Sequence, residues 1–409
     1  MGTDVADGKP VSVLRTRGSG REIRRPFDRA RARCGVLAAL LGAVLAMCAS
    51  VPAAQAQSSY AQGADPASPN PLLGQRWYTD NRYGLPARAA RAYDSRGQKG
   101  KAAMMRMIAD RPQFRWFGEF NAREPGGMAG SVRRFIQRSR QEQPGSVPQI
   151  ALMRHAGDAC NPSYQGGGPA EDARTRAWWN DAVRGIGNSR VVIAFEPDSL
   201  GTVDCLARSR RDDRIKLLRY GVEVLSRLPN ATVYIEAAAS DWLPARLIAS
   251  RLRQVGVSKV RGFMLNVTHY DWTAANIRYG RKISRMTGGK HFVVNTAQNG
   301  RGAVHAYRRK GRQTRRIFVR CPLRRGLGVA PSTQTADPLV DAFLYIGRVG
   351  VSGGSCVKGP RKVGAWYPER ALMFAKYATN WLSPPRGTRY GLEQRVPLRT
   401  LSGAEARFR

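Results

Sequence analysis

A strand-like run of residues in this chain ends in two carboxylates. In the stretch VVIAFEPDSLGT, residues 191–202, Glu196 and Asp198 flank Pro197, which fixes the local direction of the chain. Unpaired carboxylates are costly to bury inside a strand, so this pair fits a strand end that opens into a cleft. If the chain stays extended through Pro197, both side chains leave on one face, and their repulsion raises the pKa of one of them. A general acid that works near neutral pH requires such a raised pKa.

Other strand-like runs also end in polar or aromatic residues. The residues at these ends are His155, Asp158, Glu196, Asp198, Glu236, Asp241, Trp242, Asn266, His269, Asp271, Asn295, Gln298 and Asn299. Carboxylates and amides bind hydroxyl groups, indole faces stack on sugar rings, and paired carboxylates can act as acid and base at a glycosidic bond. This composition predicts a sugar-binding site.

Each of these residues also has a structural interpretation, which the sequence leaves open. Glu196 can brace neighbouring Arg or backbone groups, and Asp198 can cap a helix. Trp242 and His269 can be packing residues of the core. Asp271 can cap a loop or form a salt bridge.

The elements that would position these residues alternate between strands and helices. Strand patterns occupy residues 147–155, 190–198, 231–238, 259–268, 290–297 and 341–347, and helical patterns occupy residues 170–187, 211–228, 244–256, 273–288 and 368–382. This alternation predicts an α/β fold with a parallel sheet, and the number of strands favours a barrel. No G-x-G-x-x-G motif follows the first strand, which argues against a dinucleotide. We also expect no other cofactor and no metal. In a parallel barrel the active site lies at the carboxyl ends of the strands.

The charge of the chain is strongly positive. Its 409 residues include 68 basic and 29 acidic residues, a formal net charge of +39, and only 11 of the basic residues are Lys. An Arg-rich solvated surface explains this charge most simply, and attraction to an anionic polymer or membrane surface is the functional alternative. The run RRKGRQTRRIFVRCPLRRG, residues 308–326, suits an anionic partner best. It contains a single aromatic residue, so we expect no nucleic-acid partner.

Residues 1–56 are typical of an export signal. Six Arg residues between positions 21 and 33 precede an apolar run at 34–51, and Ala54-Gln55-Ala56 follows as a cleavage pattern. The apolar run is short for a membrane span, so we expect a secreted or periplasmic protein without stable membrane insertion, and a retained anchor is the alternative. Residues 57–70 are typical of a short linker, and residues 386–409 form a basic tail.

Four cysteines follow the predicted signal: Cys160, Cys205, Cys321 and Cys356. An even number in an exported protein favours two disulfide bonds, and four cysteines allow three pairings. A zinc site is the rival interpretation, but the sequence has no C-x-x-C motif and no close Cys and His cluster.

Four motifs resemble glycoside hydrolase family 6 in their order and spacing. They are VVIAFEPDSLGT, VYIEAAASDWL at 233–243, RGFMLNVTHYDW at 261–272 and HFVVNTAQNGRG at 291–302. The resemblance covers residues 71–385 and implies a monomeric, inverting β-1,4-glucanase or cellobiohydrolase on a distorted, incomplete β/α barrel. It implies that Asp198 protonates the leaving oxygen with help from Asp158, and that the disulfides are Cys160–Cys205 and Cys321–Cys356. We expect a β-glucan substrate to contact Trp77, Glu236, Trp242, Asn266, His269 and Arg348.

The chain departs from the family pattern at positions that matter for catalysis. Ala159 stands at the aspartate of the family's Arg-Asp-Cys motif, and Glu236 and Arg348 replace an aspartate and a sugar-binding lysine. Val357 stands at the proposed catalytic base, and a valine side chain cannot accept a proton. Three functions therefore remain: a glycosidase with another base or a water relay, a non-catalytic carbohydrate-binding protein, and a charge-driven binder of anionic polymers. Only the last should lose affinity steeply with salt.

Overall fold

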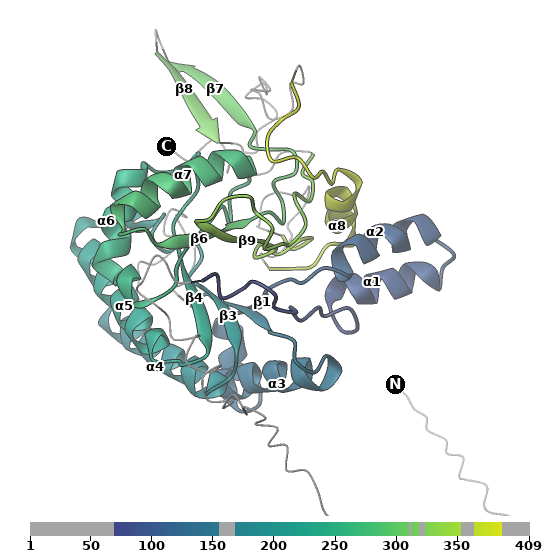
Figure 1. Cartoon of the computed structure of the whole chain (residues 1–409), viewed down its shortest axis with the longest axis horizontal. Coiled ribbons are helices and arrows are strands. Elements are labelled where there is room, and N and C mark those ends of the chain that lie inside the picture. The colour runs from purple at the N-terminus through teal and green to yellow at the C-terminus, as the bar shows by residue number, and fades with distance from the viewer. Residues whose placement is uncertain (1–68, 155–167, 311–312, 319–323, 353–363, 387–409) are drawn as a thin grey trace, which may run out of the picture. The chain divides into compact units, whose positions relative to one another are not determined.

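A computed structural model describes residues 69–154, 168–310, 313–318, 324–352 and 364–386. Its main sheet contains seven parallel strands in the order β1-β2-β3-β4-β5-β6-β9 (Figure 1). The strands are β1 Arg115–Phe117, β2 Gln149–Leu152, β3 Val191–Phe195, β4 Ala231–Glu236, β5 Gly262–Leu265, β6 His291–Asn295 and β9 Val340–Leu344. A second, antiparallel pair consists of β7 His305–Lys310 and β8 Gln313–Phe318.

The main sheet curls until its two edge strands approach each other. The contact between them is limited in extent. Gln113 pairs with Tyr345 in an isolated parallel bridge, and the Phe114 amide donates to the Tyr345 carbonyl at 3.1 Å. The indole of Trp116 on β1 donates to the Ile346 carbonyl beyond β9 at 2.6 Å. The result is the distorted, incomplete β/α barrel that the sequence predicts.

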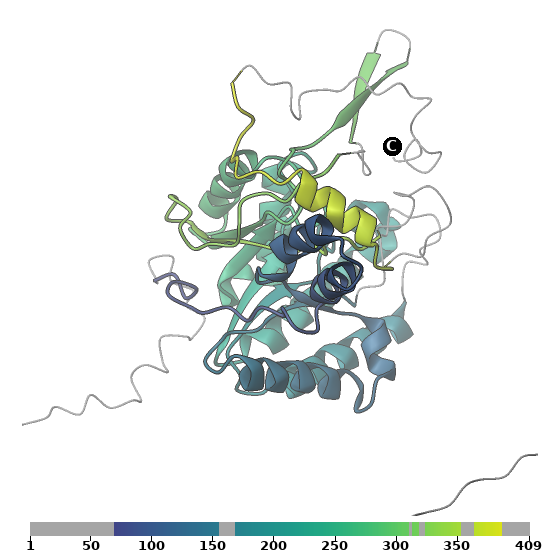
Figure 2. The same ribbon diagram turned by 90° about the vertical axis from the view of Figure 1, so that its right-hand side faces the viewer.

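Two groups of helices surround this sheet. The outer arc contains α3 Gly127–Glu142, α4 Pro169–Ile186, α5 Arg208–Ser226, α6 Ala245–Val255 and α7 Thr273–Met286 (Figure 1). The second group contains α1 Leu85–Asp94, α2 Lys99–Ala109 and α8 Pro368–Lys376, which lie side by side (Figure 2). Tyr345 and Val349 pack with this second group, so it covers the junction of β1 and β9.

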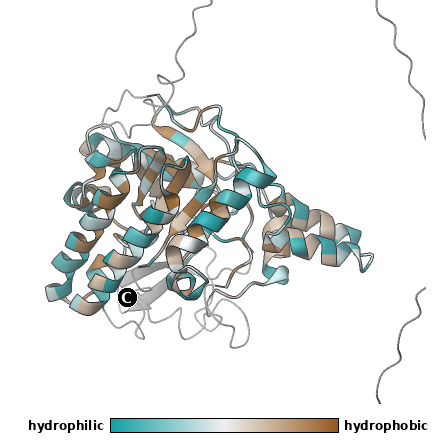
Figure 3. Cartoon of the chain, turned by 90° about the horizontal axis from the view of Figure 1, so that it is seen from below, coloured by the Kyte–Doolittle hydropathy of each residue, from teal (hydrophilic) through white to brown (hydrophobic). Residues whose placement is uncertain are grey.

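Side-chain alternation along the strands produces two apolar layers. On β3, Val192 and Ala194 face the inside of the barrel, whereas Val191, Ile193 and Phe195 face the helices. Figure 3 shows the same division, with apolar strands at the centre and mostly polar outer surfaces on the helices. This alternation decides which way a residue at a strand end points, and it therefore builds the site.

The strands and helices predicted between residues 147 and 382 are all present, with bounds shorter by one to several residues at most ends. Asn70, the last residue of the predicted linker, donates to the Asp341 carbonyl at 2.7 Å, so the folded part begins at or before it. None of the helices among the described residues is long and apolar enough to cross a membrane.

Candidate active site

The chain turns sharply where β3 ends, and this turn places Asp198. The Glu196 amide still continues the sheet, since it donates to the Leu152 carbonyl at 2.8 Å. Glu196 and Asp198 then take left-handed conformations, with φ values of 52° and 70°, which are uncommon for residues other than glycine. The Asp198 side chain is partly exposed and accepts a hydrogen bond from the Thr268 hydroxyl. Asp198 thus stands at the carboxyl end of the sheet, held from the loop that follows β5.

Glu196 does not share a face with Asp198, contrary to the expectation from their spacing. Its side chain is fully buried, and one carboxylate oxygen accepts hydrogen bonds from the Arg154 amide at 2.9 Å and the Trp179 indole at 2.8 Å. The two left-handed residues break the extended conformation on which that expectation depended. Glu196 therefore braces the barrel wall, which is the structural role that the sequence left open.

The carboxylate that does act on Asp198 belongs to β4. Glu236 is buried beneath the turn and accepts the amides of Leu200 and Gly201 at 2.7 and 3.2 Å. Burial and the negative charge of Asp198 raise the pKa of Glu236 to about 8, despite these hydrogen bonds. Glu236 therefore carries a proton near neutral pH, in the neighbourhood of the Asp198 carboxyl group. The expected sugar contact of Glu236 is wrong, since its side chain is enclosed by backbone.

An aromatic pair lies beside this turn. The rings of Trp242 and His269 stack with their centroids 4.6 Å apart and their planes at 10°. The imidazole Nδ1 lies 3.0 Å from a carboxylate oxygen of Asp241, and His305 Nε2 lies 3.8 Å from the other oxygen. Burial alone would raise the pKa of Asp241, but His269 and His305 leave it below its ordinary value. Both stacked rings stay partly exposed, so they can border a ligand.

Gly201 allows this arrangement. A Cβ atom at residue 201 would overlap the six-membered ring of Trp242, so only glycine fits against the indole. Glu236 also accepts the Gly201 amide, so the turn that bears Asp198 and the pair of Trp242 and His269 pack together as one unit. The sequence predicted Trp242 and His269 at this rim, and the structure places both next to the loop that bears Asp198.

Asn266 is a structural residue and not a sugar contact. It is fully buried with a φ of 69°, and its amide bonds the carbonyls of Asp271 and Asn295 at 3.1 and 3.2 Å. Asn295 reciprocates by donating to the Asn266 carbonyl at 2.8 Å. These amides satisfy backbone groups where two neighbouring strands turn into loops, so they fix the rim without reaching its surface.

Across the barrel from β4, a second aromatic surface lies at the junction of β1 and β9. The Arg348 guanidinium is exposed and stacks over the Trp116 ring, 4.8 Å from its centroid. Arg348 was expected here, whereas Trp116 was missed because β1 is only three residues long. The signal that could have found it is the aromatic run at residues 114–117, just before a Gly.

Trp77 lies elsewhere, so its expected role is wrong. It pairs with Val147, which precedes β2, and packs against the apolar layer inside the barrel near the amino ends of the strands. Asp158, Val357 and three of the cysteines (Cys160, Cys321 and Cys356) lie outside the described residues. Cys205 is disulfide-bonded, and the two predicted pairings stay predictions.

The fold and this rim define a β/α-barrel protein with a carboxyl pair between aromatic surfaces. The sequence pattern of the glycosyl hydrolases family 6 matches residues 72–378. Endoglucanase A of Cellulomonas fimi is 33% identical over 278 residues, 68% of this chain and 56% of that protein. Endoglucanase 1 of Streptomyces halstedii is 29% identical over 339 residues, 80% of this chain and 95% of that protein. This chain belongs to glycosyl hydrolase family 6.

A solved structure supports the same assignment. The endoglucanase Cel6 from Mycobacterium tuberculosis is 33% identical and superimposes with a TM-score of 0.64, over 75% of this chain and 99% of that one. It was solved in complex with methyl-cellobiosyl-4-deoxy-4-thio-β-D-cellobioside. The chain spans little more than half the length of the Cellulomonas relative, and nearly the whole of the solved domain.

Proposed function

We propose that this protein is an exported, inverting glycoside hydrolase that cleaves β-1,4 bonds in cellulose or a related β-glucan. The observation that carries the proposal is the pair of Asp198 and Glu236, two carboxyl groups that interact at the carboxyl end of the barrel. Family membership and the cello-oligosaccharide in the Mycobacterium relative support a β-1,4-glucan as the substrate.

Asp198 is the general acid in this proposal. The group that protonates the leaving oxygen must be exposed to substrate, hold a proton near neutral pH and keep one orientation. Asp198 is partly exposed, lies near the carboxyl group of Glu236, and is oriented by the Thr268 hydroxyl. Proton transfer to the glycosidic oxygen breaks the bond from that oxygen to C1 while water adds to the opposite face of C1. The water proton passes to solvent, and the new sugar end has inverted configuration.

The base is the step at which the chain differs from its family. Val357 cannot take the water proton, and Asp158 is the nearest carboxylate in sequence to the position where Ala159 replaces the family's aspartate. We assign Asp158 an assisting role that acts through water. If Asp158 does not assist, the second candidate function is favoured. This candidate is a carbohydrate-binding protein with the same rim and slow or no turnover.

The remaining parts of the proposal concern the whole protein. Residues 1–56 direct export and are removed, the folded domain extends to about residue 385, and the mature protein acts as a monomer outside the cytoplasm. The A-x-A pattern and the short apolar run support the first point. N-terminal sequencing of secreted protein that began after Ala56 would agree with it.

A panel of polysaccharides tests the proposed activity. β-1,4-Glucan, mixed-linkage glucan, β-1,3-glucan and chitosan are incubated with the full chain, and new reducing ends are counted. We expect cleavage of the first two, which contain β-1,4 bonds, and none of β-1,3-glucan, which lacks them. Chitosan is cationic, so we expect a protein with a net charge of +39 to repel it. Binding of β-1,4-glucan without any new reducing ends would favour the carbohydrate-binding alternative.

A further inference from the structure

Asp241, in the loop that follows β4, is a carboxylate to which the proposed catalysis gives no role. Its side chain is 2% exposed, and one of its oxygens lies 3.0 Å from Nδ1 of His269, in the loop that follows β5. The other oxygen lies 3.8 Å from Nε2 of His305. Because an ionised carboxylate only accepts hydrogen bonds, the His269 nitrogen that faces Asp241 carries a proton. Asp241 therefore fixes the orientation of the His269 ring.

Other hydrogen bonds hold these two loops together without Asp241. The Ser240 hydroxyl donates to the Asp271 carboxylate at 2.6 Å, and the Ser240 amide donates to the side-chain oxygen of Asn276 at 3.1 Å. Asp271 is two residues after His269, and Asn276 lies in the first turn of α7. The loops after β4 and β5 are thus joined through neighbours of Asp241 and His269. The contact between Asp241 and His269 adds control over the imidazole ring itself.

The imidazole that Asp241 orients is one half of an aromatic pair. His269 and Trp242 stack in nearly parallel planes, and both side chains stay partly exposed. A parallel stack restricts rotation of both rings, so the orientation of His269 also restrains the indole. Flat aromatic surfaces of this kind are suited to contact with the apolar faces of sugar rings.

The pair of His269 and Trp242 lies next to the proposed acid. Thr268, the residue before His269, donates to the Asp198 carboxylate. Gly201, in the turn that bears Asp198, packs against the six-membered ring of Trp242. A sugar unit that contacts the pair is therefore close to the bond whose oxygen Asp198 is proposed to protonate.

We propose that Asp241 is a positioning residue for the substrate: through His269, it holds the pair of His269 and Trp242 as a rigid platform for the sugar unit beside the cleaved bond. The inference rests on the proposed function, and it adds a residue that affects binding without contacting the substrate. A platform that is ordered before binding loses less conformational freedom when the sugar binds. Without the Asp241 carboxylate, the imidazole can turn, and ordering the pair then costs affinity.

Binding of cellohexaose tests this inference. The sugar is titrated calorimetrically into the full chain carrying Asp198→Asn, so that turnover is slow. Adding Asp241→Leu should weaken binding about three- to fivefold, as expected for a partial loss of an aromatic contact. Adding Asp241→Asn, whose amide oxygen can still accept the His269 proton, should keep the affinity within about twofold. With Asp198 intact, Asp241→Leu should raise KM by a similar factor and change kcat little, because Thr268 still holds the acid.

A double variant shows whether Asp241 acts through His269. His269→Ala should weaken binding at least as much as Asp241→Leu does, and the two changes together should weaken it no more than His269→Ala alone. His291→Ala is the matched control, because His291 Nδ1 lies 3.1 Å from the buried Asp341 carboxylate at the amino ends of the strands. This change removes the same type of contact far from the platform and should leave the affinity at the parent value.

The outcomes separate this inference from the proposed function. Unchanged affinity in Asp241→Leu would overturn the inference, and so would losses that multiply in the double variant or an equal loss in His291→Ala. If Asp241→Leu does not fold, Asp241→Ser takes its place with the same expectation. Hydrolysis of cellohexaose by the unmodified protein would leave the proposed function standing in each case. The expected losses of affinity without any hydrolysis would support the role of Asp241 in binding and contradict the proposed function.

Discussion

The two ends of the barrel differ in how their charged side chains are paired. At the amino ends of the strands, Asp341 is fully buried, and its carboxylate receives two hydrogen bonds of 2.8 Å from Arg261 and one of 2.6 Å from Tyr234. His291 Nδ1 lies 3.1 Å from the same carboxylate. At the carboxyl ends, Asp241 is paired with His269, but groups of like charge also interact there: Asp198 with Glu236, and Arg325 with Arg370.

This difference teaches how to distinguish structural from functional charges in the fold. Asp341 lies at a register shift between β6 and β9, where Val340 pairs with Phe292 and Ala342 with Val293. The extra residue turns its carboxylate toward opposite charges, and these hold its pKa below the ordinary value although burial raises it. At the amino ends of the strands, the buried charges are thus paired with opposite charges. At the carboxyl ends, Asp198 and Glu236 instead form a site that we expect a substrate to complete.

The largest expected effect is on the rate of hydrolysis when the acid is removed. Asp198→Asn should lower kcat by about 10²–10⁴-fold, the usual contribution of acid–base assistance. Binding of cellohexaose should change only a few-fold, because the amide keeps the shape of the carboxyl group. A β-cellobiosyl fluoride, which needs little protonation, should recover part of the rate.

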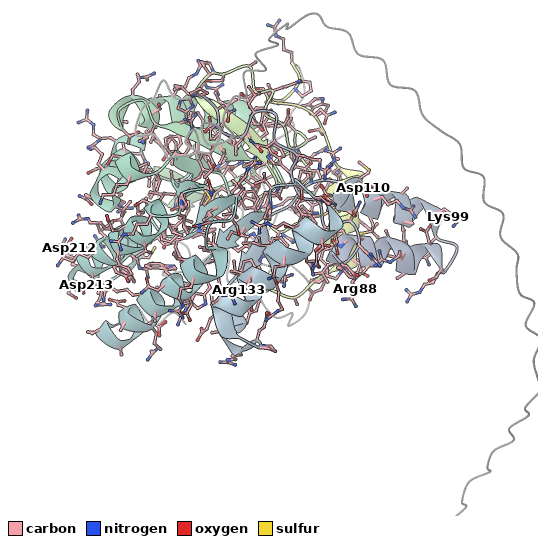
Figure 4. All side chains as sticks on the ribbon, turned by 60° about the horizontal axis from the view of Figure 1, so that its bottom comes forward. Arg88, Lys99, Asp110, Arg133, Asp212 and Asp213 are labelled. Carbon is pink, nitrogen blue, oxygen red and sulfur yellow. The ribbon has the colours of Figure 1, made fainter. Side chains whose placement is uncertain are left out.

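Asp212→Asn provides the matched control for this change. Asp212 is an exposed carboxylate on α5, at the outer edge of the molecule (Figure 4). Its substitution should leave kcat unaltered. A parent-like rate in Asp198→Asn would instead transfer the acid role to another group and favour the binding-protein alternative.

The next largest effect is on stability at the opposite end of the barrel. Arg261→Met should lower the free energy of unfolding by about 3–5 kcal/mol, because it leaves the Asp341 carboxylate buried without its cation. The double variant Arg261→Met/Asp341→Leu should regain much of this loss. Urea unfolding measures both, and kcat/KM at low temperature should stay near the parent value. A loss of activity without a loss of stability would contradict the division between the two ends.

A smaller effect is expected on the pH dependence of activity. Glu236 gains a negative charge near Asp198 as the pH rises past about 8, and Glu236→Gln removes that charge. The site then gives up its catalytic proton more easily, so the alkaline limb of the kcat/KM profile should move to lower pH, by about one unit or about 1.4 kcal/mol. Thermal melts would show whether the loss of the Leu200 and Gly201 hydrogen bonds also loosens the turn. A shift to higher pH would contradict the coupling.

The smallest effect concerns the aromatic pair. Trp242→Ala should raise KM for oligosaccharides about three- to tenfold through the loss of a stacking surface, with kcat changed less. Trp242→Phe keeps a ring against His269 and should stay closer to the parent. A large fall in melting temperature with unchanged kinetics would show that this indole serves the core alone.

Most of the fold could be predicted because its signals are local. Runs such as Val191–Phe195 combine β-branched and aromatic residues, and α6 shows the four-residue spacing of Ile248 and Leu252 before its terminal Gly256. Residues 85–142 gave no comparable assignment, since the Ala-rich and Arg-rich helices there bury narrow faces, and β1 is too short to show alternation.

The candidate site could be predicted only as a rim. Asp198, Trp242, His269 and Arg348 do lie after strands, as the sequence predicted, and their roles toward a substrate stay predictions. Position after a strand could not tell Glu196 from Asp198 as the outward-facing carboxyl group, because left-handed backbone at residues other than glycine leaves no mark in the sequence. The sequence also could not tell that Glu236 and Asn266 are buried and cannot contact a ligand. Their burial depends on loops that come together only in the folded chain.

The configuration of the first product tests the central claim most directly. Proton NMR follows the anomeric signals while the full chain degrades cellohexaose, before mutarotation equilibrates them. An acid at Asp198 with water added from the opposite face predicts that the α-anomer accumulates first, and that Asp198→Asn abolishes this signal on the same timescale. Initial accumulation of the β-anomer, or an undiminished α-anomer signal from Asp198→Asn, would contradict the account.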